Sequence, residues 1–240
     1  MTYIGCSGWY YKEWKGIFYP PNLPQQNYFS YYATHFNTVE INNTFYHFPN
    51  QKTVQLWYQQ TPKNFKYSIK ASRYITHIKK FKDVQEPLKH IYGLSNTLDE
   101  KMGCFLFQFP RHFCFAKERL DQILSQLDTK QKNVIEFRHP SWWVPQVISA
   151  LESANVIFCS VSGFDLPQEF IIINNCAYIR FHGVPAYRGS YLERALSEWI
   201  QQINKSHLKE LWVYFNNTFH GYAVQNAFEF RKGLGTYNQL

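Results

Sequence analysis

The sequence predicts an α/β protein folded as a single (β/α)₈ TIM barrel over residues 1–240, with a short or missing sixth helix. Eight short runs rich in β-branched and aromatic residues begin on average about 30 residues apart, close to the spacing expected when a barrel of about 250 residues is divided into eight units. Amphipathic segments separate the runs, and polar residues gather at their C-terminal ends. The runs are TYIGCS (2–7), TVEIN (38–42), KYSIKA (66–71), GCFLFQ (103–108), NVIEFR (133–138), VIFCSV (156–161), AYIRFH (177–182) and LWVYFN (211–216).

Helical periodicity lies between the runs. Leu120, Ile123, Leu124 and Leu127 follow the i, i+3, i+4, i+7 pattern, and a similar stripe covers 192–203. Alternation of strands and helices predicts a parallel sheet, and the first turn, GCSGW, lacks the GxGxxG fingerprint typical of an open doubly wound sheet. The sixth and seventh runs leave too few residues between them for a full helix and two loops, so we expect that helix to be short or absent.

Composition limits the class of protein. A chain of 240 residues with 45% hydrophobic and 19% aromatic residues can bury one sizeable core, which excludes disordered and collagen-like proteins. Five cysteines without a CxxC spacing argue against a disulfide scaffold or a zinc finger. The sequence shows no signal peptide and no long apolar stretch, so we expect a cytoplasmic protein with no membrane partner.

Polar residues are placed for a site at one end of the barrel. Successive side chains of a strand point to opposite faces, and in 38–42 the polar Glu40 and Asn42 alternate with Val39 and Ile41. The apolar face of a barrel strand meets the helices, so we expect the polar face to point inward and its last residues to line the C-terminal mouth, where active sites of this fold lie. The polar residues expected there are Glu40, Asn42, Ser68, Lys70, Gln108, Glu136, Arg138, Arg180, His182 and Asn216.

The charges at this end are unequal. Lys70, Arg138 and Arg180 exceed Glu40 and Glu136 by one cation, and the whole chain carries a formal charge of +8. Buried charges need partners, so an excess cation favours an anionic ligand. The alternative interpretation is a structural lattice in which the charges neutralise one another across neighbouring strands.

Loops after the strands add candidate binding groups. HGVPAYRGSY and NNTFHGYA follow the seventh and eighth runs, where this fold often binds phosphate, and they bring Tyr187, Arg188 and Asn217 close to Arg180 and Asn216. Aromatic residues of the first, second and fifth loops either stack on a ligand or fold over the barrel as core. These aromatic residues are Trp9, Tyr10, Trp14, Phe45, Tyr46, Trp142 and Trp143, and His77 and His139 are either acid–base groups or solvated loop residues.

A metal site is not predicted, and the sequence points to no particular cofactor. Glu40, Glu136, His139, Asp165 and His182 are potential ligands near strand ends, but no HxH, HExxH or DxD signature is present. The adjacent lysine and arginines would also repel a divalent cation. Cysteine nucleophiles are disfavoured because Cys6, Cys104 and Cys159 have the character of core residues.

Seven segments in order carry a resemblance to a known family: IGCSGWYYKEWKGIFYP, FNTVEINNTFYHFP, FKYSIKASRYITH, GCFLFQFP, VIEFRHPSWW, YIRFHG and WVYFNNTFHGYAVQNA. The sequence resembles the YecE-like family, also called domain of unknown function 72, over essentially its whole length. The resemblance implies a TIM barrel but no reaction, because the family's activity is undetermined. One departure is the ending VSGFD after the sixth run, which displaces Asp165. The positions that match the motifs are Gly8, Trp9, Glu40, Asn42, Tyr46, Lys70, His77, Gln108, Glu136, Arg138, Trp142, Arg180, His182, Asn216 and Asn217.

We therefore predict an enzyme, a hydrolase or isomerase, that applies general acid–base chemistry to a small anionic substrate such as a phosphorylated sugar or a nucleotide-like molecule. Two alternatives stay open: a protein that binds or processes nucleic acid through its basic surface, including 77–90, and its aromatic rim, and a ligand-binding barrel without catalysis. The predicted proton-transfer residues are Glu40, Glu136 and His182. The predicted substrate-binding residues are Trp9, Asn42, Tyr46, Lys70, His77, Gln108, Arg138, Trp142, Arg180, Tyr187, Asn216 and Asn217.

Overall fold

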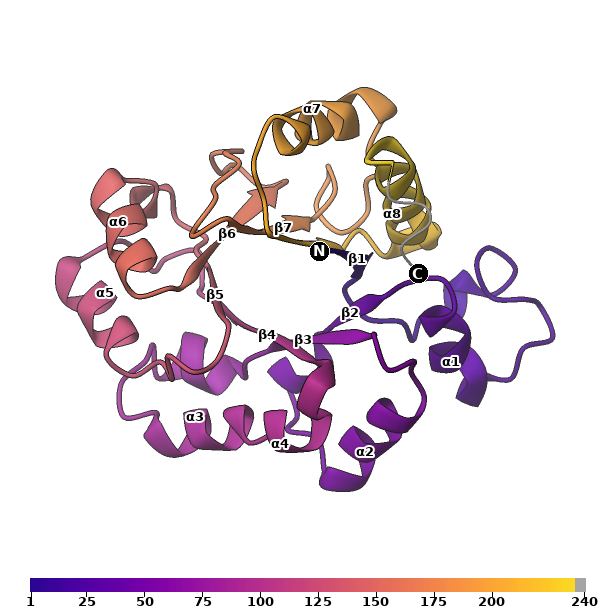
Figure 1. The fold of residues 1–240 in the computed structure, drawn as a ribbon, viewed down its shortest axis with the longest axis horizontal. Helices are drawn as coiled ribbons and strands as arrows, with labels where there is room; N and C mark the ends of the chain where they lie inside the picture. Colours follow the sequence, from indigo (N-terminus) through magenta and orange to yellow (C-terminus); the bar gives the residue numbers. More distant parts are fainter. Residues whose placement is uncertain (236–240) are drawn as a thin grey trace.

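The computed structural model describes residues 1–235, and residues 236–240 of the predicted domain lie outside that part. Within it, eight parallel strands form a nearly closed barrel in which hydrogen-bonded neighbours run in the order β1, β8, β7, β6, β5, β4, β3, β2 (Figure 1). The predicted TIM barrel is confirmed. The strands are β1 (Thr2–Cys6), β2 (Thr38–Ile41), β3 (Lys66–Lys70), β4 (Met102–Gln108), β5 (Asn133–Glu136), β6 (Ile157–Ser162), β7 (Cys176–Phe181) and β8 (Glu210–Phe215).

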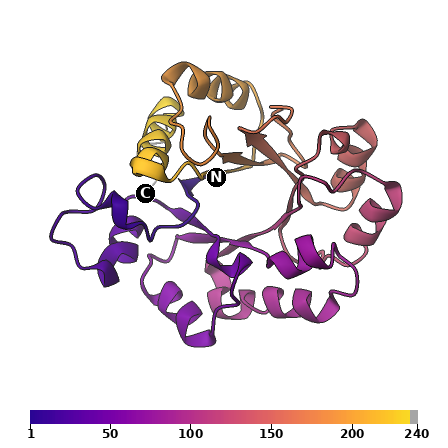
Figure 2. The same ribbon diagram turned by 180° about the vertical axis from the view of Figure 1, so that it is seen from behind.

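Helices surround the strands, as the views from the two sides show (Figures 1 and 2). No helix stands between β6 and β7 in the described residues, which confirms the expectation drawn from the short spacing there. None of the described helices is long and apolar enough to cross a membrane. The α-helices are α1 (Tyr28–Ala33), α2 (Gln51–Gln59), α3 (Gln85–Tyr92), α4 (Ser95–Leu98), α5 (Lys117–Leu124), α6 (Pro145–Ser153), α7 (Glu193–Asn204) and α8 (Tyr222–Gly233).

Short 3₁₀ segments and one π-helix lie in the loops. The π-helix η4 (Tyr74–Ile78) follows β3, at the C-terminal end of the barrel, and such turns occur frequently at functional sites. The 3₁₀ segments are η1 (Lys12–Trp14), η2 (Gln25–Asn27), η3 (Asn43–Phe45), η5 (Asp99–Lys101), η6 (Pro140–Trp142) and η7 (Phe219–Gly221).

The alternation of side chains along the strands divides the core in two. Residues such as Val39 and Ile69 face outward and pack with the helices in a large outer core. The opposite faces fill the inside of the barrel with a smaller, separate cluster, so the interior is packed below the mouth. Its members are Tyr3, Cys104, Leu106, Val134, Ile157, Cys159, Val161, Tyr178, Trp212 and Tyr214.

Side chains close the barrel between β1 and β2. The two strands share one backbone bridge in the described residues, Ser7 with Glu40. The hydroxyl of Tyr32 also bridges the two strands, since it accepts from the amide of Cys6 at 2.7 Å and donates to the carbonyl of Thr38 at 3.0 Å. This seam fixes β2 beside β1 and thereby holds the last residues of both strands at the mouth.

Candidate functional site

A network of buried charges crosses the barrel just below the mouth. Glu40 is the last inward-facing residue of β2, Glu136 is the last residue of β5, and Arg180 lies on β7. All three side chains are buried. Arg180 Nη2 lies 2.6 Å from Glu40 Oε1, and its Nη1 pairs with Glu136. One arginine on β7 therefore bridges two glutamates that come from opposite parts of the barrel.

Glu40 is fully engaged in this network. Besides Arg180, the hydroxyl of Ser7 donates to Oε1 at 2.6 Å and the hydroxyl of Tyr178 donates to Oε2 at 2.7 Å. Tyr178 in turn lies 2.7 Å from the hydroxyl of Ser68. Tyr178 and Arg180 lie on β7 and Ser7 directly follows β1, so Glu40 ties β2 to β1 and β7 and, through Tyr178, to β3.

Glu136 and His182 form the second half of the network. Glu136 Oε1 pairs with Arg138 and lies 3.3 Å from His182 Nε2. Burial alone would raise the pKa of Glu136, but Arg138, Arg180 and His182 together hold that pKa well below its usual value. Burial and the neighbouring Arg138 lower the pKa of His182 to about 3, so its ring is neutral near pH 7. The remaining nitrogen, Nδ1, faces the amide of Asn216 at 3.3 Å.

Lys70 differs from the other cations of the mouth. It ends β3, is 9% exposed, and its Nζ lies 4.2 Å from the centre of the Phe45 ring. No carboxylate of residues 1–235 lies within 4.0 Å of this nitrogen, and it makes no hydrogen bond there. Burial and then Arg180 lower the pKa of Lys70 to about 7, against the opposing effect of Glu136. The predicted surplus of one cation is therefore located at Lys70, because the two arginines pair with the two glutamates.

His77 and Gln108 lie at the same corner of the mouth. The π-helix after β3 brings His77 Nε2 to 3.5 Å from Gln108 Nε2, and the His77 ring packs edge-on against Phe45 at 5.0 Å. Burial, followed by the charge of Lys70, lowers the pKa of His77 to about 4. Unlike His182, His77 is partly exposed, so an imidazole that is neutral near pH 7 faces the solvent.

Phe164 covers the other side of the mouth. The guanidinium of Arg138 lies 4.1 Å from the centre of its ring, and that of Arg111 lies 4.8 Å from the same centre. The ring also packs 4.9 Å from that of His182. Phe164 has a φ of 60°, a left-handed conformation that is strained for an aromatic residue and is often found at functional sites. Arg138 is thus 7% exposed beneath an aromatic cover.

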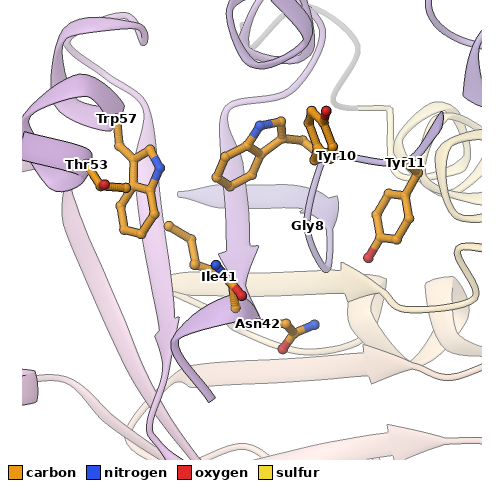
Figure 3. Close-up of a pocket in the computed structure, with 9 residues that line it drawn as sticks. Gly8, Tyr10, Tyr11, Ile41, Asn42, Thr53 and Trp57 are labelled. Atoms are coloured by element: carbon orange, nitrogen blue, oxygen red, sulfur yellow. The ribbon is translucent and has the colours of Figure 1, made fainter. Parts of the chain in front are cut away.

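A cavity of about 440 Å³ opens over the ends of β1 and β2. Figure 3 shows Thr53 and Trp57 of α2 on one side and the loop that follows β1 on the other, with Ile41 and Asn42 between them. Asn42 Oδ1 is buried and has no hydrogen-bond partner among the described residues. The register pairs Ile41 with Ile69, and Asn42 and Lys70 are the residues that follow them in the chain. The lining residues are Gly8, Trp9, Tyr10, Tyr11, Ile41, Asn42, Asn43, Thr53 and Trp57.

Other predicted binding residues are placed apart from this corner. Trp142 is completely buried outside the barrel, stacked on Phe137 at 3.8 Å. Asn217 is buried and donates to Gly189 O at 3.0 Å, which links the loops after β7 and β8. Tyr46 and Tyr187 are exposed on loops of the mouth. Of the sequence-predicted residues, the structure therefore gathers two groups, the charge network and the corner formed by Lys70, His77 and Gln108.

Sequence reasoning missed three contributors. Ser7 and Tyr178 share the inward faces of β1 and β7, so the same alternation that indicated Glu40 and Arg180 also indicates them. Phe164 has no comparable signal, since a loop residue without a repeating pattern is placed only by its tertiary contacts. Cys6, Cys104 and Cys159 are buried core residues as expected, and burial raises the pKa of each thiol. Among residues 1–235, no three His, Cys, Asp or Glu side chains are grouped to hold a metal ion.

The family model described as "Protein of unknown function DUF72" matches residues 3–240. Among curated proteins, the UPF0759 protein YunF of Bacillus subtilis (strain 168) is 25% identical over 264 aligned residues, which cover 95% of this chain and 92% of that protein. The UPF0759 protein YecE of Escherichia coli (strain K12) is 27% identical over 146 residues, covering 60% of this chain and 50% of YecE.

Solved structures of the same description share the fold. A DUF72 family protein from Thermotoga maritima MSB8 is 28% identical, with a TM-score of 0.88 over 98% of this chain and 99% of that one. A DUF72 family protein from Enterococcus faecalis V583 has a TM-score of 0.82 at 21% identity, over 98% of this chain and 96% of that one. These relatives carry the same barrel, and their descriptions assign no substrate.

Proposed function

This chain belongs to the DUF72 family of proteins of unknown function, and we propose that it is an enzyme that applies general acid–base chemistry to a small anionic substrate at the C-terminal mouth of the barrel. A phosphorylated sugar or a nucleotide-like molecule fits this description. The reaction is a hydrolysis or an isomerisation.

The observation that carries the proposal is the unpaired cation at the mouth. Arg138 and Arg180 are neutralised by the two glutamates, whereas Lys70 is nine-tenths buried without a carboxylate partner in residues 1–235. An anionic group of a ligand would supply the missing partner. Arg138 adds positive potential from the other side of the mouth, because it is slightly exposed beneath Phe164.

Proton transfer is assigned to the groups that a substrate can reach. His77 is neutral near pH 7, partly exposed and adjacent to Gln108, which suits a general base. Glu40, Glu136 and His182 are fully buried. Both glutamates pair with Arg180, and His182 lies beside Glu136, so we assign these three residues the role of orienting the arginines. Their direct participation in proton transfer, expected from the sequence, stays a prediction.

Binding of inorganic phosphate tests the anion site. Calorimetric titration of the wild type, Arg138→Gln and the control Lys132→Gln, at the opposite end of the barrel, distinguishes the mouth from the rest of the surface. We expect Arg138→Gln to weaken binding by roughly tenfold, the effect of a lost charge-assisted hydrogen bond, while Lys132→Gln binds as the wild type does. Equal affinities in all three proteins would show that phosphate binds away from the mouth and would contradict the proposed anion site.

Turnover tests the catalytic part. Phosphorylated sugars and nucleotides are incubated with the protein and followed by phosphorus NMR, with His77→Gln as the test variant and the exposed His207→Gln as its control. Loss of a general base lowers kcat by about 100-fold or more. Saturable binding without turnover by the wild type would instead indicate a ligand-binding barrel.

Nucleic-acid binding is the competing outcome. The basic stretch 77–90 does not form one helix but passes from the π-helix through a loop into α3, with positive φ angles at Lys80, Phe81 and Asp83. A steep loss of oligonucleotide binding with rising salt, together with no response to phosphorylated sugars, would favour this alternative.

A further inference from the structure

We propose that Lys70 is a nucleophile that forms an iminium bond with the carbonyl carbon of a small anionic aldehyde or ketone. This inference rests on the proposed function, because it uses the same mouth and narrows the substrate to a carbonyl compound. It assigns Lys70 a covalent role in place of simple charge attraction.

The geometry separates Lys70 from other buried lysines. Lys101 is 4% exposed and its Nζ also lies 4.2 Å from a ring centre, that of Tyr58, but it donates to Thr61 O at 2.7 Å and to Tyr58 O at 2.5 Å. Lys70 has the aromatic neighbour without the acceptors. An amine with no hydrogen bond to break and little water around it has an available lone pair whenever it is deprotonated.

Burial favours the neutral form of the Lys70 amine, while the surrounding charges act in both directions. Burial is the largest cause of the lowered pKa. Arg180 and Arg138 also oppose protonation of the amine, whereas Glu136 and Glu40 favour it, and the pKa of Lys70 falls to about 7. At pH 7 about half of the Lys70 amine is uncharged, against roughly one molecule in 3,000 for an exposed lysine of ordinary pKa. His77 is the neighbouring group that can move protons, and its own pKa of about 4 leaves it able to accept one.

The covalent step balances without a further reactant. The Lys70 nitrogen forms a bond to the carbonyl carbon while the C=O π electrons move to oxygen, and one proton passes from the nitrogen to that oxygen, which gives a neutral carbinolamine. A proton then joins the hydroxyl, water leaves, and the nitrogen lone pair forms the C=N⁺ bond. The iminium carries one positive charge, as the protonated lysine does, so the mouth keeps its affinity for the anionic group, which Arg138 is placed to receive.

The cavity over the ends of β1 and β2 suggests the rest of the substrate, because β2 pairs with β3, the strand that Lys70 ends. Asn42, which lines this cavity directly after β2, has a buried Oδ1 without a partner among residues 1–235. This oxygen is an acceptor, and a hydroxyl group of the substrate would satisfy it. Trp9 and Trp57 form apolar walls of the same cavity. A short hydroxylated carbonyl compound with a phosphate or carboxylate group has the required chemistry.

Reductive trapping tests the inference. The wild-type protein is treated at pH 7 with dihydroxyacetone phosphate and sodium cyanoborohydride, which reduces an iminium to a stable secondary amine, and the adducts are located by peptide mass spectrometry. We expect Lys70 to be labelled at least about tenfold faster than any exposed lysine. Lys101 serves as the internal control and stays unlabelled because its amine is hydrogen-bonded. In Lys70→Arg, which keeps the charge, the selective adduct disappears.

A neutral probe separates the two proposals. If dihydroxyacetone labels Lys70 as fast as its phosphate ester does, and inorganic phosphate does not protect, the nucleophile is confirmed and the anion site fails. If phosphate binds at the mouth but Lys70 is labelled no faster than exposed lysines, the anion site survives and the iminium inference is overturned.

Discussion

The two ends of the barrel hold their lysines in opposite ways. At the N-terminal end, the amines of Lys101 and Lys132 are directed at oxygen acceptors: backbone carbonyls for Lys101 and the carboxylate of Glu210 for Lys132. At the C-terminal end, Lys70 has an aromatic ring and two neighbouring arginines but no acceptor within residues 1–235. The N-terminal arrangement stabilises the fold, whereas the C-terminal one leaves an interaction for a ligand to complete.

The ion pairs at the two ends of the barrel also differ in how far they are buried. The side chains of Lys132 and Glu210 are 34% and 17% exposed, so water screens their attraction. The pairs of Arg180 with Glu40 and Glu136 are completely buried, and Glu136 also pairs with Arg138. Removing a charge therefore has very different consequences at the two ends.

The largest expected effect is that of Arg180→Met. It leaves two buried glutamates without their shared cation, and we expect the free energy of unfolding to fall by about 3–5 kcal/mol. Urea denaturation at pH 7 measures the change. A loss below about 1 kcal/mol would show that the network is not structural and that the two ends differ less than their burial indicates.

Replacing the two buried lysines by methionine should change the free energy of unfolding in opposite directions. An unfolded lysine binds its proton below pH 10.5, but folded Lys70 does so only below about 7, so at pH 7 the protonated amine favours unfolding. Lys70→Met should raise the free energy of unfolding by about 2–3 kcal/mol, with a smaller gain at higher pH. Lys101→Met should lower it by about 1–3 kcal/mol, because it leaves buried carbonyl oxygens unpaired. Destabilisation of both variants in denaturation experiments would remove the contrast.

Acidification should lower the free energy of unfolding because of the buried His182. Its pKa is lowered to about 3 in the folded protein, so between pH 6.5 and 3 the unfolded chain binds a proton that the folded chain does not. Stability therefore decreases as the pH falls, by about 2 kcal/mol between pH 7 and pH 5 for this group. His182→Gln should flatten the profile by that amount in urea titrations at the two pH values. An unchanged slope would mean that His182 is protonated in the folded state.

The smallest effect is expected at the N-terminal end. Lys132→Met removes a partly exposed ion pair with Glu210 and should cost about 1 kcal/mol or less, decreasing further at high salt. Thermal unfolding at low and high ionic strength checks this value. A loss as large as that of Arg180→Met would show that water does not screen this pair.

The strands and the orientation of their residues were predictable because they depend on local patterns. Alternation along 38–42 and 133–138 correctly directed Glu40 and Glu136 inward, since a strand places every second side chain on the same face. The absence of a helix between β6 and β7 followed from the small number of residues between the sixth and seventh runs. Trp142 and Trp143 could not be placed in this way, because a loop aromatic residue has no repeating pattern to show whether it faces the mouth or the helices.

The sequence by itself determined the barrel and the set of charged residues carried by its inner faces, because strand periodicity and segment spacing are properties of the chain. Only the tertiary structure decided which cation remains without a partner, since Arg180 is neutralised by glutamates distant in the sequence and Lys70 is turned toward Phe45 instead. Pairing depends on distances across the barrel, and those distances follow from strand register, closure between β1 and β2, and the packing of loops such as that of Phe164.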